Sequence, residues 1–194
     1  MSNWDPFAKV QRLKKANPTR PFDSKQGRLP PGQYLTEKFP ILHYGGVPKF
    51  DPQTWDFKIW GLVENPIRLN WDEFVKLPTT EVVTDIHCVT RWSKFDTKWR
   101  GVPWHWVMET AQPKPEAQYI MLHSEYNYTA NVPLADCLSD PYTMLAYQYN
   151  DLPLEPDHGY PLRFLLPHLY FWKSAKWLRG IEFMSTDRAG FWEG

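Results

Sequence analysis

Cysteine and net charge are both scarce in this chain. Its 194 residues include two cysteines, Cys88 and Cys137, and 22 basic side chains offset 22 acidic ones. Two cysteines cannot build the disulfide framework typical of small exported domains, so both are expected to be free thiols. A net charge of zero provides no general attraction for nucleic acid or for an anionic membrane. We therefore expect no nucleic-acid partner.

Long apolar runs are also missing. The chain begins Met-Ser-Asn-Trp-Asp-Pro-Phe, which lacks the apolar segment of a signal peptide. No uninterrupted apolar stretch approaches the roughly 20 residues that cross a membrane as a helix. These two absences predict a cytoplasmic protein with no membrane span.

The common nucleotide, nucleophile and metal motifs are absent as well. There is no Gly-x-Gly-x-x-Gly, no phosphate-binding P-loop, no Gly-x-Ser-x-Gly and no Cys-x-x-Cys. The six histidines lack the spacing of a zinc site. These absences argue against dinucleotide-binding, P-loop, serine-hydrolase and zinc classes.

Glycine is outnumbered by proline, ten to nineteen, which predicts a loop-rich fold with short strands and few long helices. Apolar residues make up 42% of the chain, enough for a core, and we expect one domain over residues 38–194.

The first 33 residues carry a net charge of +5 without sustained periodicity. Residues 1–37 are therefore predicted to be an extended basic arm. A solvated tail is the simpler interpretation of this arm, and a docking arm is the alternative.

Periodicity predicts an α+β fold with mixed β-sheets and short helices. Trp55, Phe57 and Ile59 alternate on one face of a strand, while Asn70 and Glu73 form a helix-capping pattern. Strands are expected at 55–63, 81–88, 119–124, 143–149, 162–166 and 177–184, and helices at 70–78, 103–111 and 134–138.

One candidate for chemistry is a cysteine at the end of a predicted strand. The segment reads Asp85-Ile86-His87-Cys88-Val89-Thr90-Arg91-Trp92-Ser93. A cationic setting from neighbouring His87 and Arg91 would favour the thiolate, the form that ligates soft metals or attacks electrophiles. Taken alone, a single cysteine is more often a small buried apolar residue.

A second candidate is a basic turn late in the chain. Arg163, Lys173 and Lys176 supply positive charge, Ser174 supplies a hydroxyl, and the turn supplies backbone N–H groups. Together these groups suit a phosphate or another compact anion. A solvated turn between two strands is the alternative.

The two segments together resemble a known family. Cys-Val-x-x-Trp-Ser at 88–93, followed by Trp99-Arg100-Gly101, is similar to the molybdenum-ligand segment of the sulfite-oxidase-fold enzymes. The second half of that family is resembled by Leu145-Ala146-Tyr147, by the stretch 153–163, and by Lys173-Ser174-x-Lys176-Trp177. The motifs occur in the family's order over residues 38–186, and their combination is specific.

This resemblance implies a sulfite-oxidase-type, molybdopterin-binding domain with molybdenum–molybdopterin as the cofactor. It implies that Cys88 is the protein's sulfur ligand to the metal. Arg91 and Tyr147 would face the substrate, completing the catalytic set. The implied cofactor-binding positions are His43, Tyr44, Ser124, His158, Arg163, Ser174, Ala175 and Lys176. No comparable role falls to Cys137, which we expect in the core.

The chain departs from true sulfite oxidases in one respect. Those enzymes have an arginine pair after the ligand cysteine, whereas in this chain Arg91 is followed by Ser93 and Lys94. The pattern is closer to bacterial methionine-sulfoxide reductases. We therefore expect a stand-alone molybdenum-dependent oxidoreductase, acting by oxygen-atom or two-electron transfer on a small oxyanion or S-/N-oxide, as a monomer with an external electron-transfer partner. Two alternatives stay open: a non-catalytic molybdopterin-binding module, and a metal-free domain in which Cys88 is a reactive thiol.

Overall fold

Two β-sheets make up the framework of the chain, which the computed structural model describes for residues 27–43 and 45–193. The strands of sheet A are β1 (Tyr34–Leu35), β4 (Thr80–His87), β5 (Trp92–Pro103), β8 (Met144–Tyr149), β9 (Leu152–Pro153) and β10 (Arg163–Leu165). They follow the order β1-β5-β8-β10, with β4 also paired to β5 and β9 to β8.

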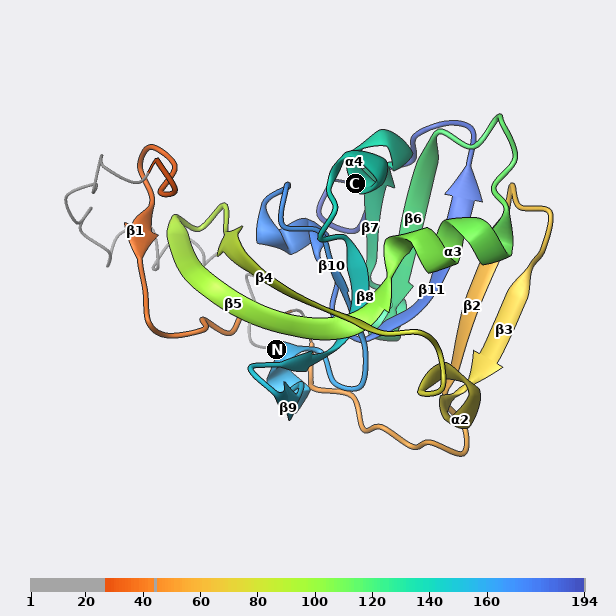
Figure 1. The fold of residues 1–194 in the computed structure, drawn as a ribbon, viewed down its shortest axis with the longest axis horizontal. Coiled ribbons are helices and arrows are strands. Elements are labelled where there is room, and N and C mark those ends of the chain that lie inside the picture. The colour runs from red at the N-terminus through yellow and green to blue at the C-terminus, as the bar shows by residue number, and fades with distance from the viewer. Residues whose placement is uncertain (1–26, 44, 194) are drawn as a thin grey trace, which may run out of the picture.

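Sheet B has five strands in the order β3-β2-β11-β6-β7. They are β2 (Asp56–Gly61), β3 (Ile67–Asn70), β6 (Tyr119–Ser124), β7 (Thr129–Pro133) and β11 (Leu178–Met184). The β1–β5 and β2–β11 pairs are parallel, while the other pairs of these sheets are antiparallel. The predicted α+β class with mixed sheets is thus confirmed. Figure 1 shows sheet B on one side of the molecule and the long β4–β5 hairpin reaching toward β1 on the other.

The helices are short and connect the strands. The α-helices are α2 (Trp71–Phe74), α3 (Trp104–Ala111) and α4 (Leu134–Ser139), and the 3₁₀ turns are η1 (Glu125–Asn127), η2 (Pro156–His158) and η3 (Phe171–Lys173). The predicted capping pattern at α2 is present: the Asn70 side chain accepts from the Glu73 N–H at 2.9 Å, and the Glu73 carboxylate accepts from the Asn70 N–H at 2.8 Å. This reciprocal pair satisfies two backbone donors at the helix start.

The predicted strands and helices all occur, with ends shifted by a few residues. The long strand β5 was not expected. Asp96 has a left-handed backbone (φ 53°), and a register shift on β4 lies between Thr84 and Ile86. These irregularities break the alternation of apolar and polar residues by which a strand is recognised in sequence.

The described part of the predicted N-terminal arm already contacts the domain. β1 pairs in parallel with the start of β5, matching Tyr34 with Trp92 and Leu35 with Ser93. Leu29 is buried as well. Ordered contacts therefore begin before residue 38, while residues 1–26 of the predicted arm lie outside the described residues.

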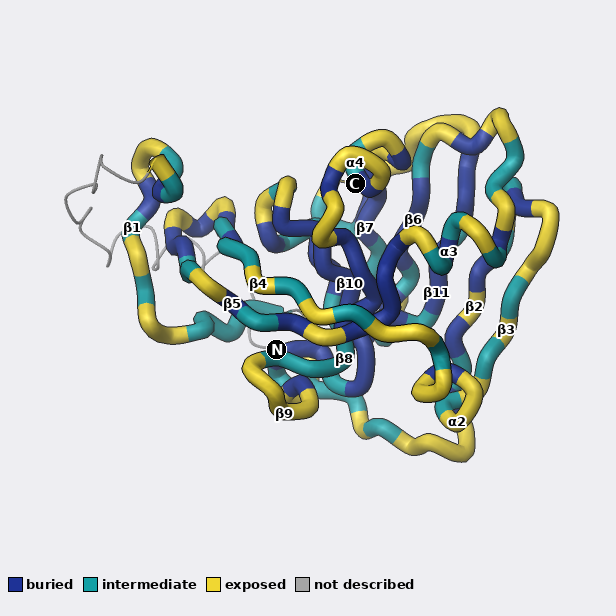
Figure 2. The backbone as a smooth tube through the Cα atoms, in the orientation of Figure 1, coloured by how far each residue is buried: buried dark blue, intermediate teal, exposed yellow. Residues whose placement is uncertain are grey.

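The core consists of two clusters on opposite faces of sheet A. Figure 2 shows the buried stretches of the chain along the strands in the middle of the molecule. The larger cluster lies between the sheets and includes Phe57 from β2 and Leu145 from β8. The smaller cluster includes Cys88, Trp92, Trp99, Ala146, Leu165 and Phe171. Each large apolar side chain that becomes fully buried contributes about 1.5–3 kcal/mol. Cys137 belongs to the larger cluster, as expected.

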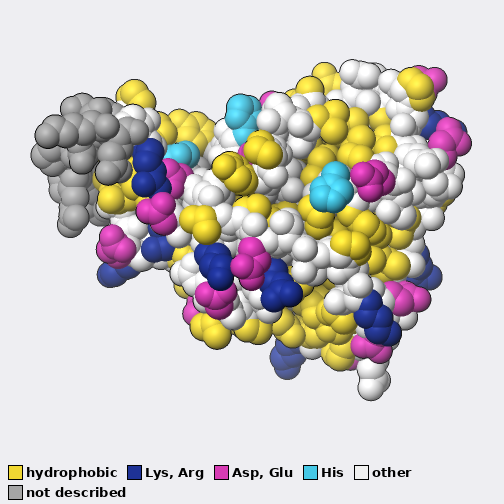
Figure 3. Space-filling view, viewed as in Figure 1, with side chains coloured by type: hydrophobic (Ala, Val, Ile, Leu, Met, Phe, Trp, Pro, Cys, Tyr) yellow, Lys and Arg dark blue, Asp and Glu magenta, His cyan; other side chains and the backbone are white. Residues whose placement is uncertain are grey.

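The face of the molecule in Figure 3 shows no strong charge segregation. On the face in Figure 3, basic and acidic side chains are interspersed among apolar ones. Within the described ranges, no helix combines the length and the apolar character needed to cross a membrane.

Candidate functional site

Cys88 lies in a tight turn that connects β4 to β5. Its N–H donates to the Trp92 carbonyl at 2.9 Å, and its carbonyl accepts from the Arg91 N–H at 2.9 Å. Arg91 closes the turn with a left-handed backbone (φ 70°). The Thr90 hydroxyl donates to Cys88 Sγ at 3.2 Å. The turn therefore fixes both the backbone and the sulfur of Cys88.

The surroundings of Cys88 are apolar rather than cationic. Only 6% of the residue is exposed, and this burial raises the pKa of the thiol, although hydrogen bonds around Thr90 act in the opposite direction. His87 donates to or accepts from Ser93 Oγ at 2.8 Å, and burial lowers its pKa, so it adds no positive charge at neutral pH. A raised pKa disfavours the interpretation of Cys88 as a freely reactive thiol. A bound metal cation would reverse the balance, because a coordinating thiol is deprotonated.

The structure does not gather the whole predicted catalytic set. Arg91 is exposed at the Cys88 turn. Tyr147 is partly buried on β8 and packs against the larger cluster, whereas Cys88 belongs to the smaller one. Arg91 thus lies in the same turn as the thiol, and Tyr147 lies on the other face of sheet A.

Arg163 is a buried cation at the start of β10. It is 2% exposed and donates from Nη1 to the His158 carbonyl at 2.9 Å and from Nη2 to the Ser174 carbonyl at 2.8 Å. Nε finds no acceptor among the described residues, and no carboxylate there pairs with the guanidinium. Burial lowers the pKa of Arg163 to about 9. A buried charge without a counter-ion is costly, so this arrangement calls for an anion.

Aromatic rings connect Arg163 to the cysteine turn. Its guanidinium lies 4.2 Å from the centre of the Phe171 ring and 5.5 Å from that of Trp99. Both rings belong to the smaller cluster, together with Cys88. The thiol and the buried cation therefore adjoin the same apolar cluster.

The segments 158–163 and 174–176 are held tightly together. Gly159 has φ +112°, and a Cβ there would lie 3.1 Å from the Lys176 Cβ and 3.2 Å from the Arg163 Cβ. Lys176 Nζ donates to the Asp157 carbonyl at 2.7 Å. Gly159 supplies both the backbone conformation and the close approach that a larger residue would prevent.

Ser174 and Ala175 are used largely through their backbones. The Ser174 carbonyl accepts from Arg163, its hydroxyl accepts from the Leu166 N–H at 3.0 Å, and the Ala175 carbonyl accepts from the Phe164 N–H at 2.8 Å. Both residues are 2% exposed. These contacts hold the turn against β10 and thereby position the Arg163 side chain.

The two predicted histidines, His158 and His43, lie near Arg163 and Lys176. The His158 ring stacks on Phe39, with centroids 3.8 Å apart, and its pKa falls to about 4 because of burial and the nearby Arg163 and Lys176. His43 contacts Asp157 Oδ1 through Nε2 at 3.2 Å. A neutral His158 can both donate and accept, which suits a heterocycle. Tyr44 lies outside the described residues.

The last of the predicted cofactor-binding residues is Ser124, which lies in sheet B. It ends β6 beside Leu178 of β11, is 8% exposed, and its buried Oγ has no hydrogen-bond partner in the described structure. A buried hydroxyl without a partner costs about 1–3 kcal/mol, so it is a second group that a polar ligand would satisfy.

Phe39, Thr90 and Gln33 also contact the residues of this site, and the sequence pattern did not identify them. Of these three residues, only Thr90 lies inside the cysteine motif, so only Thr90 could have been found from the sequence.

Comparison with known proteins now decides the family. Residues 44–192 match the family described as "Oxidoreductase molybdopterin binding domain". The chain belongs to this family. It is 48% identical over 170 residues to "Uncharacterized oxidoreductase YuiH" of Bacillus subtilis, covering 87% of this chain and 85% of that protein.

More distant relatives have stated activities. "Protein-methionine-sulfoxide reductase catalytic subunit MsrP" of Campylobacter jejuni is 27% identical over 161 residues, covering 74% of this chain and 54% of that protein, so this chain spans about half its length. The crystal structure of the sulfane dehydrogenase SoxCD from Paracoccus pantotrophus superposes with a TM-score of 0.66 at 21% identity, covering 75% of this chain and 42% of that one. This similarity confirms the sulfite-oxidase-type fold.

Membership makes molybdenum–molybdopterin the cofactor, and the residues present fit it. Arg163 Nε and Ser124 Oγ are buried donors without partners in the described structure, as a phosphorylated, heteroatom-rich ligand requires. No group of three His, Cys, Asp or Glu side chains in the described ranges could hold a metal ion by itself.

Proposed function

We propose that this molybdenum oxidoreductase transfers an oxygen atom or two electrons on a small oxyanion or S-/N-oxide, with Cys88 as the protein's ligand to the metal. The buried, unpaired guanidinium of Arg163 carries this proposal, because it calls for an anion next to the cluster that holds the thiol. The bound cofactor supplies a metal that changes oxidation state by two electrons.

Each group of residues has a distinct part in the proposal. Arg163 and Lys176 bind the cofactor's phosphate, assisted by the backbone of Ser174 and Ala175, because charge-assisted hydrogen bonds suit a buried dianion. His158 orients the pterin by hydrogen bonding. His43, Tyr44 and Ser124 contact the cofactor from the facing loop and from the end of β6.

Arg91 is assigned to the substrate. It is exposed at the Cys88 turn, and its guanidinium makes no salt bridge within the described ranges. One arginine suits a monoanion or the oxygen dipole of a neutral oxide better than a dianion, which would need more positive charge. Tyr147, on β8, is the second proposed substrate residue, although it packs against the larger cluster.

The supply of electrons is assigned to an external partner, and the expected location is the cytoplasm. The relative MsrP of Campylobacter jejuni is a catalytic subunit. By analogy, electrons would reach or leave this domain through a separate protein.

Metal and pterin analysis tests the proposal. Protein purified from a molybdenum-replete host should contain close to one molybdenum per chain and release a pterin on denaturation. Turnover of sulfoxides, N-oxides or small oxyanions should then be detectable with an artificial electron donor or acceptor. Molybdenum far below stoichiometry, with no pterin, would contradict the proposal.

A non-catalytic molybdopterin-binding module is the second candidate. The observation that favours it is the position of Tyr147, which packs against the larger cluster and not with Cys88. This candidate requires the same metal content. It differs in requiring no turnover of any of the three substrate classes.

A further inference from the structure

The segment that precedes the family domain is packed directly on the Cys88 turn. We name residues 28–36 the clamp segment. It lies before residue 44, where the match to the molybdopterin domain begins. Nevertheless β1 within it forms the edge of sheet A beside Trp92 and Ser93, just after the turn.

Gln33 makes the buried contact of the clamp segment. It is 5% exposed, and its Nε2 donates to the Cys88 carbonyl at 3.1 Å. Its Oε1 accepts from the Ser93 hydroxyl at 3.2 Å. One side chain therefore bridges the two ends of the turn. Because the Arg91 N–H donates to the same Cys88 carbonyl, Gln33 supplies the second of its two donors.

Backbone hydrogen bonds extend this bridge. The Tyr34 N–H donates to the Arg91 carbonyl at 2.8 Å, and the Thr36 N–H donates to the Ser93 carbonyl at 2.9 Å. The clamp segment thus contacts the ligand position, the proposed substrate residue and the strand that follows.

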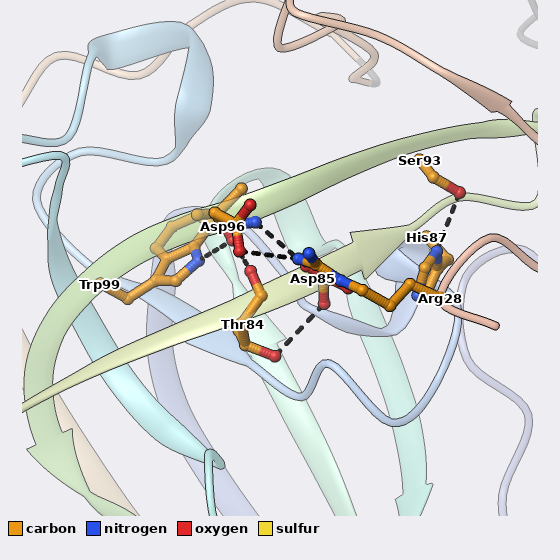
Figure 4. A network of polar contacts seen from close by, with 8 residues as sticks. Arg28, Thr84, Asp85, His87, Ser93, Asp96 and Trp99 are labelled. Atoms are coloured by element: carbon orange, nitrogen blue, oxygen red, sulfur yellow. Dashed lines mark hydrogen bonds and ion pairs between the residues drawn. The ribbon is translucent and has the colours of Figure 1, made fainter. Parts of the chain in front are cut away.

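A second, exposed contact ties the clamp segment to the hairpin instead of the turn. The Arg28 guanidinium donates to Asp85 at 2.8 Å and to Asp96 at 2.7 Å (Figure 4). Arg28 and Asp96 are substantially exposed, so solvent screens this pair. The same view shows His87 hydrogen bonded to Ser93, which links the strand before the turn to the strand after it.

We propose that Gln33 is a positioning residue for Cys88: it holds the Cys88 carbonyl and keeps the turn in one conformation, so that the sulfur meets the metal in one geometry. The proposal rests on the proposed function, because Cys88 must be the ligand. Residues that orient a metal ligand without touching the metal affect the metal's properties through that orientation.

Gln33→Met tests the proposal, because it keeps the length of the side chain and removes both hydrogen bonds. Hydrogen–deuterium exchange of the cofactor-free protein should be about 10-fold faster at the amides of Cys88 and Arg91, equivalent to one lost hydrogen bond. In the cofactor-loaded protein, the paramagnetic resonance signal of pentavalent molybdenum should change from one species to a mixture. Arg28→Gln is the matched control, since it loosens the same segment without touching the turn.

Two results would overturn the proposal: wild-type exchange and resonance in Gln33→Met, or an equal change in Arg28→Gln. If Gln33→Met does not fold, Gln33→Glu decides by the same two readouts, because it keeps the side chain's shape and an acceptor for the Ser93 hydroxyl and removes the Nε2 donor to the Cys88 carbonyl. Wild-type protein without molybdenum would refute the proposed function, whereas the exchange comparison would still decide whether Gln33 holds the turn.

Discussion

The cysteine turn and the basic segment around Arg163 differ in how their polar groups are satisfied. At the turn, the N–H, carbonyl and sulfur of Cys88 all have partners within the chain. At the basic segment, Arg163 Nε has none among the described residues, and the same holds for Ser124 Oγ. A buried polar group without a partner is one that a ligand could satisfy, whereas a fully partnered group belongs to a preformed element. The turn is thus preformed, and the basic segment is the part of the site that we propose receives an anion.

The largest expected effect comes from replacing Cys88, the proposed metal ligand at the turn. We expect Cys88→Ser to lower turnover by more than about 100-fold and to abolish thiolate-to-metal absorption, because removing a ligand exceeds the effect of changing its neighbours. Pterin content should stay near the wild-type level, since the basic segment is intact. Cys137→Ser, in the larger cluster, is the control and should leave turnover unchanged. Wild-type turnover in Cys88→Ser would contradict the assignment.

The basic segment gives the next largest effect. Arg163→Met should weaken cofactor binding by about 10–100-fold, because it removes a charge-assisted donor worth about 1.5–3 kcal/mol. Pterin released per chain on denaturation measures this.

Arg179 offers the matched control for that variant. It is paired with the Asp56 and Glu125 carboxylates, unlike Arg163. Arg179→Met should lower the free energy of unfolding and leave pterin content unchanged. Equal pterin loss in both variants would show that Arg163 acts only through stability.

The low pKa of His158 predicts that the stability of the folded protein depends on pH. His158 has a pKa of about 4 in the folded protein and an ordinary value near 6.5 when unfolded. The unfolded chain therefore binds the proton more readily, and stability falls as pH drops from 6.5 to 4, by at most about 3 kcal/mol. Urea unfolding of cofactor-free protein at pH 7 and pH 4.5 measures the loss. His158→Gln should remove this part of the pH dependence, and an unchanged slope would show that protonation of His158 is not its cause.

The smallest effect is expected from the hydrogen bond to the sulfur. Thr90→Val removes the hydroxyl that donates to Cys88 Sγ and keeps the branched shape. We expect roughly a 10-fold loss of molybdenum affinity, the lower end for a neighbour of a ligand. Molybdenum retained after dialysis against a chelator measures it. Retention equal to wild type would show that the hydroxyl only fills space.

The sequence predicted much of this fold because local signals agreed with the tertiary structure. The Asn70–Glu73 cap depends on neighbouring residues alone, and local alternation was enough to indicate the strand that contains Phe57 and Ile59. β5 was missed because the left-handed Asp96 and the shifted pairing of β4 interrupt its alternation. Those features are fixed by how β5 pairs with β4 across the hairpin, which the periodicity of a single strand does not report.

The residues of the candidate site likewise divide into those that the sequence identified and those that it did not. Cys88, Arg163 and Lys176 were identified through motif order, and they lie in well-fixed segments. Gln33 and Phe39 were not, because each contacts residues more than fifty positions away. The cationic setting expected for Cys88 depended on His87 and Arg91: burial lowers the pKa of His87, which leaves Arg91 as the cation of the turn. Charge in sequence does not reveal desolvation, which decides the pKa of this histidine.

X-ray absorption at the molybdenum edge tests the central claim most directly. It counts the sulfur atoms bound to the metal in the cofactor-loaded protein. The account predicts that wild type has one sulfur neighbour more than Cys88→Ser, in which oxygen replaces the thiolate. The same number of sulfur neighbours in both proteins would contradict Cys88 as the ligand.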